Sequence, residues 1–140
     1  MKFYCSADFT KAVETLTKKP KNGYSSVVED VCKALMVMPD NILRDTNERI
    51  IQTDNQRIVK LRVANSSQNL TQKDGFRLIY CVETHRDRLV LLYVYPKRGA
   101  LAMNNIGRNF LGMLLQNLTK EINTLDEVDI TNSLSCITNK

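Results

Sequence analysis

The sequence predicts a single α+β domain in which helices cover one face of a small, mainly antiparallel sheet. Two observations indicate this fold class. Apolar residues recur at helical spacing in two stretches near the start of the chain and in one near its end, whereas residues 58–63 alternate with a period of two. A chain of 140 residues, 43% of them hydrophobic, also has the size and composition of one globular domain.

The first third of the chain predicts a short strand followed by two helices. Residues 3–5 favour a strand, and Ser6 and Asp8 are residue types that cap helices. Ser26 to Glu29 fits a capping box for the second helix, which Pro39 ends. The apolar stripes of the two helices contain Phe9, Ala12, Val13 and Leu16, then Val27, Val28, Val31, Cys32, Leu35 and Met36. A turn at Asn22-Gly23 would make them an αα-hairpin.

The rest of the chain predicts strands and a last helix, completing the order β-α-α-β-β-β-α. A short strand is expected at residues 49–53. In the next strand Val59, Leu61 and Val63 face one way while Lys60 and Arg62 face the other. Residues 65–75 form a polar loop, and residues 76–82 and 89–95 form two central strands joined by a hairpin connection at 83–87. A helix is expected at 104–123, closing a domain of residues 1–123. Residues 124–140 read as a polar, slightly acidic tail with frayed structure.

Positive charge is concentrated in one block of the chain. Between Arg57 and Arg98 there are nine Lys or Arg residues and three acids, a net +6, while residues 1–56 sum to zero and residues 99–140 to −1. The charges alternate with apolar residues on predicted strands, so rigid elements would hold them in place. Such an arrangement suits a polyanion, and nucleic acid is the first partner to consider.

Other classes of protein are disfavoured. The four cysteines are widely spaced, Cys32 and Cys81 fall on apolar stretches, and a single His is present, so neither a disulfide framework nor a zinc site is expected. No signal peptide or transmembrane helix is expected, because charges interrupt the N-terminus and the longest apolar run, residues 89–95, is short. We therefore expect a cytoplasmic protein with no metal or other cofactor and no membrane partner.

Several segments in order resemble the RelE superfamily of toxins, most closely its HigB-like branch, the toxin halves of type II toxin–antitoxin systems. They are Lys60-Leu-Arg-Val-Ala64, a polar loop closing on Gly75, Arg77-Leu-Ile-Tyr80, and Leu91-Leu-Tyr-Val-Tyr-Pro-Lys97. The resemblance covers residues 57–98, and the preceding αα-hairpin agrees in order and length. It implies a RelE-like fold.

The resemblance also implies an activity and partners. Members of this family cut messenger RNA, usually in the ribosomal A site and without a metal, leaving a 2′,3′-cyclic phosphate and a 5′-OH, and a cognate antitoxin protein silences them. The positions that match the family's catalytic set are Lys60, Arg62, Arg77, Lys97 and Arg98. We expect Arg77 to clamp a phosphate and Lys60 to be the candidate general base. Candidate RNA-binding residues beside them are Arg57, Lys73, Tyr93 and Tyr95.

Two departures from the family pattern leave an alternative open. No Tyr follows Tyr95, although some members use a Tyr in the last helix, and Ile58 stands where some have a further Lys. The alternative is a non-catalytic protein of the same fold, such as a ParE-like gyrase inhibitor or an inactivated toxin. His85, Arg86 and Arg88 lie in the predicted hairpin turn, where solvated side chains are expected rather than ligands.

Overall fold

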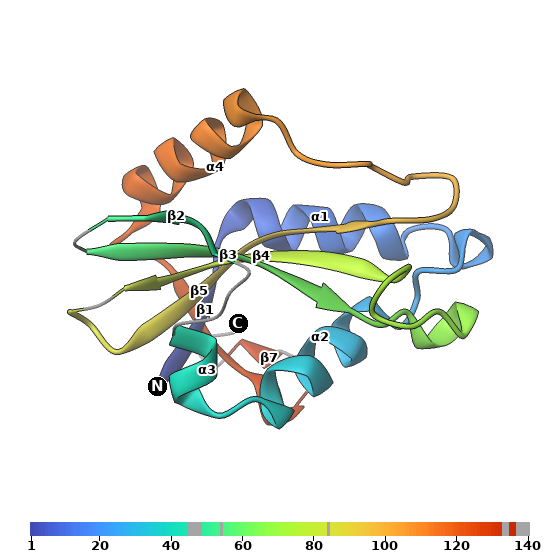
Figure 1. The fold of residues 1–140 in the computed structure, drawn as a ribbon, viewed down its shortest axis with the longest axis horizontal. Helices are drawn as coiled ribbons and strands as arrows, with labels where there is room; N and C mark the ends of the chain where they lie inside the picture. Colours follow the sequence, from blue (N-terminus) through green and yellow to red (C-terminus); the bar gives the residue numbers. More distant parts are fainter. Residues whose placement is uncertain (45–48, 54, 84, 133–134, 137–140) are drawn as a thin grey trace.

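The computed structural model describes residues 1–44, 49–53, 55–83, 85–132 and 135–136. It is an α+β fold built on a seven-stranded sheet of order β2-β3-β4-β5-β1-β6-β7 (Figure 1). The strands are β1 (Lys2–Cys5), β2 (Arg49–Gln52), β3 (Gln56–Val63), β4 (Phe76–Glu83), β5 (Arg88–Pro96), β6 (Asp126–Asp129) and β7 (Ser135–Cys136). The α-helices are α1 (Ala7–Thr17), α2 (Val27–Val37), α3 (Asp40–Arg44) and α4 (Arg108–Glu121).

Central strands β4 and β5 are buried along almost their whole length, as their continuous apolar sequence predicts. All strand pairings are antiparallel except that of β1 with β5. The predicted hairpin connection between β4 and β5 is confirmed, and Glu83 stands directly opposite Arg88 at its base. A β-bulge at Ile79 and Tyr80 changes the register with β5, so that Leu91 and Tyr93 oppose these consecutive residues.

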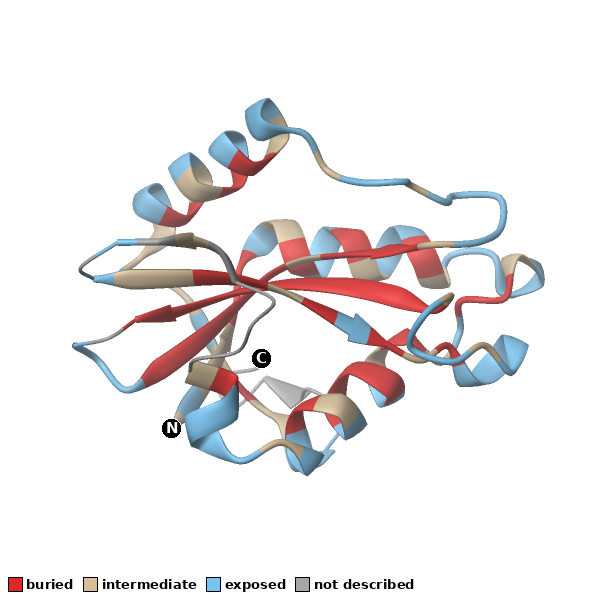
Figure 2. Cartoon of the chain, viewed as in Figure 1, coloured by how far each residue is buried: buried red, intermediate tan, exposed pale blue. Residues whose placement is uncertain are grey.

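Helices lie on both faces of the sheet, so the expectation of a single covered face is wrong. Phe9, Val31 and Leu78 belong to a core shared by α1, α2 and one face of the sheet. Leu111, Leu114 and Leu118 of α4 pack on the opposite face. The alternation of buried and exposed residues along each helix is visible in Figure 2. Residues 58–63 and 76–82 supply side chains to both cores because neighbouring residues of a strand point to opposite faces.

The N-terminal ends of α1, α2 and α4 differ in how well the sequence predicts them. The Ser6 hydroxyl accepts a hydrogen bond from the Phe9 N–H and caps α1 as predicted. Ser26 does not cap α2, and the predicted capping box is wrong there. Its hydroxyl instead bonds the Asp30 carboxylate, 2.7 Å away. Helix α4 begins four residues later than expected, at Arg108 after Gly107, because residues 104–107 continue the connection from β5.

The polar loop at 65–75 is tied down at both ends. Asp30, which is buried, accepts a hydrogen bond from the Ser66 N–H at 2.9 Å, and the Asn65 amide donates to the Gly23 carbonyl at 3.0 Å. At the other end Gly75 lies so close to β3 that an added Cβ would come within 2.1 Å of the Val63 carbonyl oxygen. Only glycine fits this approach, which fixes where β4 begins.

Residues 126–129 and 135–136 continue the sheet, in a segment that was expected to be a frayed tail. Strand β6 pairs antiparallel with β1, with Val128 opposite Phe3, and the Val128 side chain is buried. The predicted end of the domain at residue 123 therefore falls between two parts of one sheet. Among the described residues, no helix is long and apolar enough to cross a membrane.

Candidate nucleic-acid interface

Three neighbouring strands carry a row of polar side chains in register. Arg62 of β3 is directly opposite Arg77 of β4, and Arg77 is directly opposite Tyr95 of β5. Lys60 lies two residues from Arg62 on β3 and so points to the same face. Lys97 directly follows the end of β5, where its N–H donates to the Gly75 carbonyl at 2.8 Å. We call five of these residues the basic face: Lys60, Arg62, Arg77, Tyr95 and Lys97. The register of the sheet thus brings together four of the five predicted catalytic positions.

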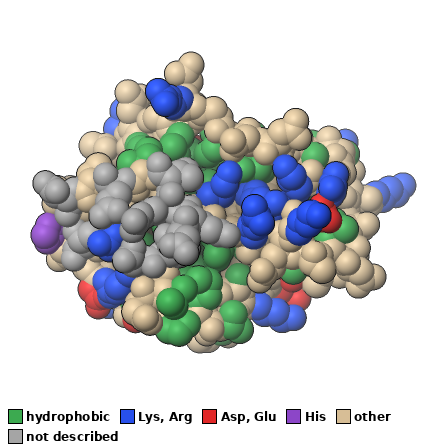
Figure 3. Space-filling view, viewed as in Figure 1, with side chains coloured by type: hydrophobic (Ala, Val, Ile, Leu, Met, Phe, Trp, Pro, Cys, Tyr) green, Lys and Arg blue, Asp and Glu red, His purple; other side chains and the backbone are tan. Residues whose placement is uncertain are grey.

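The basic face lies on the same side of the sheet as α4, beyond the part that the helix covers. Ile58, Ile79 and Leu92 pack beneath α4, and the next residues of the same parity along β3 and β4 are Lys60 and Arg77. Figure 3 shows Lys and Arg side chains gathered over the strands, with an acidic side chain among them. Like charges directly opposite each other on a sheet are destabilising, and a bound polyanion would relieve this repulsion.

The Arg77 guanidinium binds its own chain. It donates hydrogen bonds to three carbonyl oxygens, those of Gln72 at 3.0 Å, Lys73 at 2.7 Å and Phe76 at 3.2 Å. The side chain is buried, with 7% of the residue exposed. The expected phosphate clamp is therefore not what this structure shows. Arg77 holds the end of the 65–75 loop, and the accessible charges of the basic face belong to Lys60, Arg62 and Lys97.

Arg98, the fifth predicted catalytic residue, pairs with an acid that the prediction overlooked. Its guanidinium donates two hydrogen bonds to Asp74 Oδ1, from Nη2 at 2.7 Å and from Nε at 3.1 Å. The Arg98 hydrogen bond, with the charges of Arg98, Lys73 and Arg77, holds the pKa of Asp74 below its ordinary value. Asp74 therefore stays ionised at neutral pH and offsets part of the positive charge beside the basic face.

Lys60 lies beside the N-terminus of α4. Its ammonium donates a hydrogen bond to Asn105 Oδ1 at 3.4 Å, and Lys60, Asn105 and Arg108 line a common cavity of about 290 Å³. The N-cap residue Gly107 supplies no side-chain hydrogen bond to the first turn of α4. The first N–H groups of a helix favour anions, so this end of the helix adds to the positive potential around Lys60.

Arg57 lies on the opposite side of the sheet from the basic face, whereas Lys73 lies beside Arg77, which donates a hydrogen bond to the Lys73 carbonyl oxygen at 2.7 Å. Arg57 has the parity of Val59 and lies on the α2 side of the sheet, where its Nη1 donates to the Arg44 carbonyl at 3.3 Å. Strict alternation along β3 indicates this position, since Arg57 is an odd number of residues from Lys60. Lys73 is exposed in the loop next to Asp74.

The two predicted aromatic residues differ in surroundings. Tyr95 is buried within the core below α4, and burial raises the pKa of its phenol while the nearby Arg77 charge opposes that rise. Tyr93 is half-buried and packs edge-on against Phe110 of α4, with ring centroids 4.9 Å apart. Burial also raises the pKa of Tyr93, and the charge of Asp8 adds to this effect. Both phenols are therefore neutral donors near pH 7.

The expectation of solvated charge at Arg88 is wrong. Arg88 is buried and donates two hydrogen bonds to Glu83, from Nε at 2.8 Å and from Nη2 at 2.9 Å. Its guanidinium also lies 5.0 Å from the ring centroid of Tyr4. The hydrogen bond with Glu83 raises the pKa of Arg88. His85 and Arg86 are exposed in the turn, as expected.

Sequence reasoning missed Asp74, Asn105 and Phe110 as neighbours of the site. Asp74 follows Lys73 directly and could have been weighed as an internal counter-charge, but nothing in the sequence places Asn105 beside Lys60.

Cys5, Cys32 and Cys81 are buried, and burial raises the pKa of the Cys81 thiol to about 12. No group of three or more His, Cys, Asp or Glu residues suited to a metal is found within the described residues.

Comparisons with models of protein families, with curated proteins and with solved structures find no match to this chain.

Proposed function

We propose that this protein is the toxin of a type II toxin–antitoxin system, a RelE-like, HigB-related endoribonuclease that cuts messenger RNA on the ribosome without a metal and so inhibits translation. The observation that carries the proposal is the register of Arg62, Arg77 and Tyr95 across three central strands, with Lys60 on the same face and Lys97 at the end of β5. By the resemblance, Lys60, Arg62, Arg77 and Lys97 correspond to the family's catalytic set, and the proximity of these four residues supports the proposal.

The chemistry needs only proton transfer and charge stabilisation. The ribose 2′-OH loses its proton to a base and attacks the adjacent phosphorus. The bond to the 5′ oxygen breaks, and that oxygen takes up a proton. The products are a 2′,3′-cyclic phosphate and a 5′-OH. Fixed positive groups stabilise the extra negative charge on the phosphate in the transition state.

The accessible cations divide these roles. Lys60, held by Asn105 next to the N-terminus of α4, is the candidate base. Arg62, which is exposed, would stabilise the phosphate, and Lys97 would neutralise the leaving side. Arg77 acts indirectly, because its guanidinium fixes the carbonyls of residues 72, 73 and 76. Arg98 contributes when it exchanges Asp74 for the ligand.

A non-catalytic protein of the same fold, such as a ParE-like gyrase inhibitor or an inactivated toxin, is the second candidate. Two observations favour it. The Arg77 guanidinium is already bonded to backbone carbonyls, and α4, whose sequence is RNFLGMLLQNLTKE, contains no tyrosine. In this case growth arrest would come with intact transcripts and altered DNA supercoiling, or would not occur.

The proposed regulator is a cognate antitoxin with an acidic or amphipathic segment that covers the basic face in the cytoplasm. Opposite charge would steer the two proteins together, giving fast and salt-sensitive association.

Expression of the chain in a bacterium without an antitoxin, with the 5′ ends of transcripts mapped by primer extension, tests the proposal. We expect growth arrest and new ends inside translated regions. Arg62→Ala removes an exposed cation of the basic face, and loss of one such group commonly lowers the rate by about 10²–10³-fold. Arg86→Ala, in the turn that follows the far end of β4, is the matched control and should cleave like the parent. Intact transcripts in arrested cells would select the gyrase-directed alternative.

A further inference from the structure

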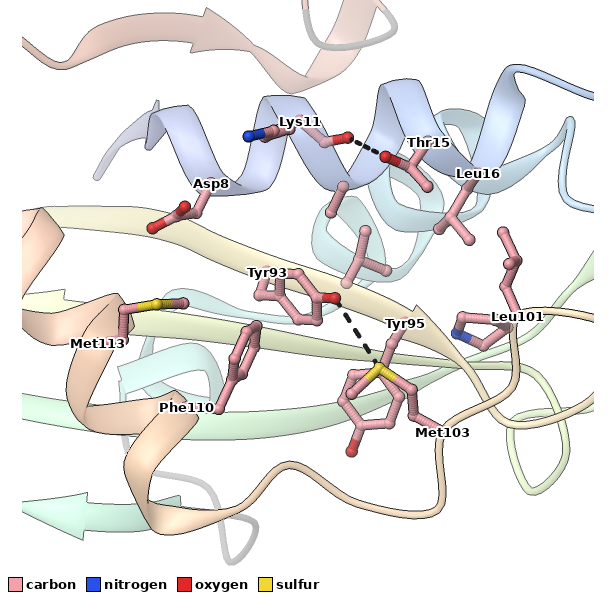
Figure 4. Close-up of a pocket in the computed structure, with 13 residues that line it drawn as sticks. Asp8, Lys11, Thr15, Leu16, Tyr93, Tyr95, Leu101, Met103, Phe110 and Met113 are labelled. Atoms are coloured by element: carbon pink, nitrogen blue, oxygen red, sulfur yellow. Dashed lines mark hydrogen bonds between the residues drawn. The ribbon is translucent and has the colours of Figure 1, made fainter.

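A cavity of about 400 Å³ lies between α1, the second half of β5, residues 101–103 and the start of α4 (Figure 4). Its volume falls within the usual range for small-ligand sites. Leu16 and Thr15 of α1 line one side, Met113 and Phe110 of α4 another, and Tyr93 lies between them. Nothing in the proposed cleavage chemistry uses this space.

The walls have the character of a stacking site. Tyr93 and Phe110 meet edge to face, and the Tyr93 hydroxyl is oriented by Met103 Sδ at 3.8 Å (Figure 4). Leu101 and Met113 line the cavity with exposed fractions of 39% and 43%, so apolar surface remains open to a ligand. Every nucleobase has a flat face that can stack on an aromatic ring, and a thioether makes favourable contacts with such a ring. These walls therefore suit a nucleobase.

The floor of the cavity is a strand edge without a strand partner. Strand β1 pairs with β5 only as far as Leu91, and in the described part of the chain no strand continues along the same edge of Tyr93–Pro96. The Met103 N–H donates a hydrogen bond to the Pro96 carbonyl at 3.0 Å.

The cavity adjoins the basic face through Tyr95. This residue lines the cavity, stands directly opposite Arg77, and precedes Lys97 by two residues. A strand of RNA whose phosphates lie along the basic face would therefore pass the mouth of the cavity. We propose that the cavity holds one unstacked nucleobase of that single-stranded RNA. This proposal rests on the RNA-binding part of the proposed function and adds to it a base-holding subsite.

Abasic RNA gives the direct test. Binding of a labelled single-stranded RNA is compared with binding of the same RNA lacking one base, moved in turn along the sequence. We expect one position at which removal of the base weakens binding by about tenfold, in the range measured for stacking on an aromatic side chain. Other positions should show smaller losses.

Variants of the cavity complete the cycle. In the Phe110→Leu protein, removal of the base at the sensitive position should weaken RNA binding no more than removal of a base elsewhere, because the stacking partner is gone. Met113→Ala, at an exposed position, repeats the test without disturbing the core, and Met36→Ala, an equally exposed methionine on α2 outside the cavity, is its control. Thermal unfolding of each variant confirms that it is folded.

The outcomes separate this proposal from the proposed function. The base subsite would be overturned if removal of a base weakened binding equally at every position, or if the large loss at one position persisted in both cavity variants. The cavity would then suit an apolar segment of a protein partner. Failure of the unmodified RNA to bind would overturn the subsite and the RNA-binding face together. Base-specific coupling in a protein that cuts no transcript would support the subsite and contradict the ribonuclease.

Discussion

Arg62 and Arg77 are directly opposite each other on β3 and β4, but their side chains have different surroundings. Arg62 is exposed, whereas the Arg77 guanidinium is enclosed by the carbonyls of residues 72, 73 and 76. A charge that is bonded to backbone carbonyls contributes to the local fold, and an exposed charge on the same row contributes to binding. The two residues therefore form a natural pair for comparison.

Arg77→Ala should lower the free energy of unfolding by about 1–3 kcal/mol, because the carbonyls that it binds lose their donors. Arg62→Ala, at an exposed position, should lower that free energy less than Arg77→Ala does and should weaken RNA binding. Urea unfolding and RNA titration of both variants measure the two effects. If Arg77→Ala were as stable as the parent protein, the structural role of its guanidinium would be wrong.

Asp74→Asn should strengthen RNA binding several-fold and make it more dependent on salt. The substitution releases Arg98 and removes one negative charge beside the basic face. Glu29→Gln, an exposed acid on α2, changes the net charge equally and serves as the control. Titrations of RNA at two salt concentrations measure the effect. Equal gains in both variants would show that only net charge matters.

The pH dependence of the Asp74 effect follows from its lowered pKa. Arg98 keeps the carboxylate ionised in the folded protein, so the ion pair is complete above the ordinary Asp pKa of about 4 and is lost only as the pH falls through the lowered pKa of Asp74. The difference in RNA affinity between the parent and Asp74→Asn should therefore be the same at pH 7 and at pH 5. A difference that disappears between these values would contradict the lowered pKa.

At the level of elements, β6 connects the end of the chain to its beginning. The pairing of β6 with β1 buries Val128 next to the first strand. Truncation after Thr124 should lower the free energy of unfolding by at least the 1.5–3 kcal/mol or so that burial of a valine contributes. Truncation after Cys136, which keeps β6 and β7, is the control, and urea unfolding of both proteins decides. Equal stability of the two would contradict the role of β6.

Local patterns in the sequence predicted the elements that depend on local spacing. The stripes of α1 and α2 and the alternation in β3 are such patterns, and these elements are where the sequence places them. Strand β6 was missed because its acidic sequence, DEVD, has low strand propensity and its partner β1 is distant in sequence. Arg88 was misread because its buried pairing with Glu83 depends on the register of a hairpin.

The candidate site was predicted in part for the same reason. Parity along single strands placed Lys60 with Arg62 and Tyr95 with Lys97. The hydrogen bonds of Arg77 to backbone carbonyls and the ion pair of Arg98 with Asp74 depend on the fold of the 65–75 loop. The sequence of this loop has no periodic pattern from which its fold could be predicted. The cavity near Tyr93 could not be foreseen, because four separate segments of the chain form it.

At the scale of the whole molecule, the positive charge is concentrated between residues 57 and 98. Four of the nine cations between residues 57 and 98 lie together at one end of three central strands, bordered by the N-terminus of α4 and by a cavity with aromatic walls. The central claim is that this face cleaves RNA by attack of a 2′-OH on the neighbouring phosphate.

Analysis of the chemical ends of the cleaved RNA tests that claim most directly. Purified protein is mixed with ribosomes carrying a defined messenger RNA, and the fragments are examined by mass spectrometry, with Lys60→Ala as the inactive control. We expect a 2′,3′-cyclic phosphate on the upstream fragment and a 5′-OH on the downstream fragment. A 3′-OH with a 5′-phosphate, or cleavage that persists unchanged in Lys60→Ala, would contradict the account.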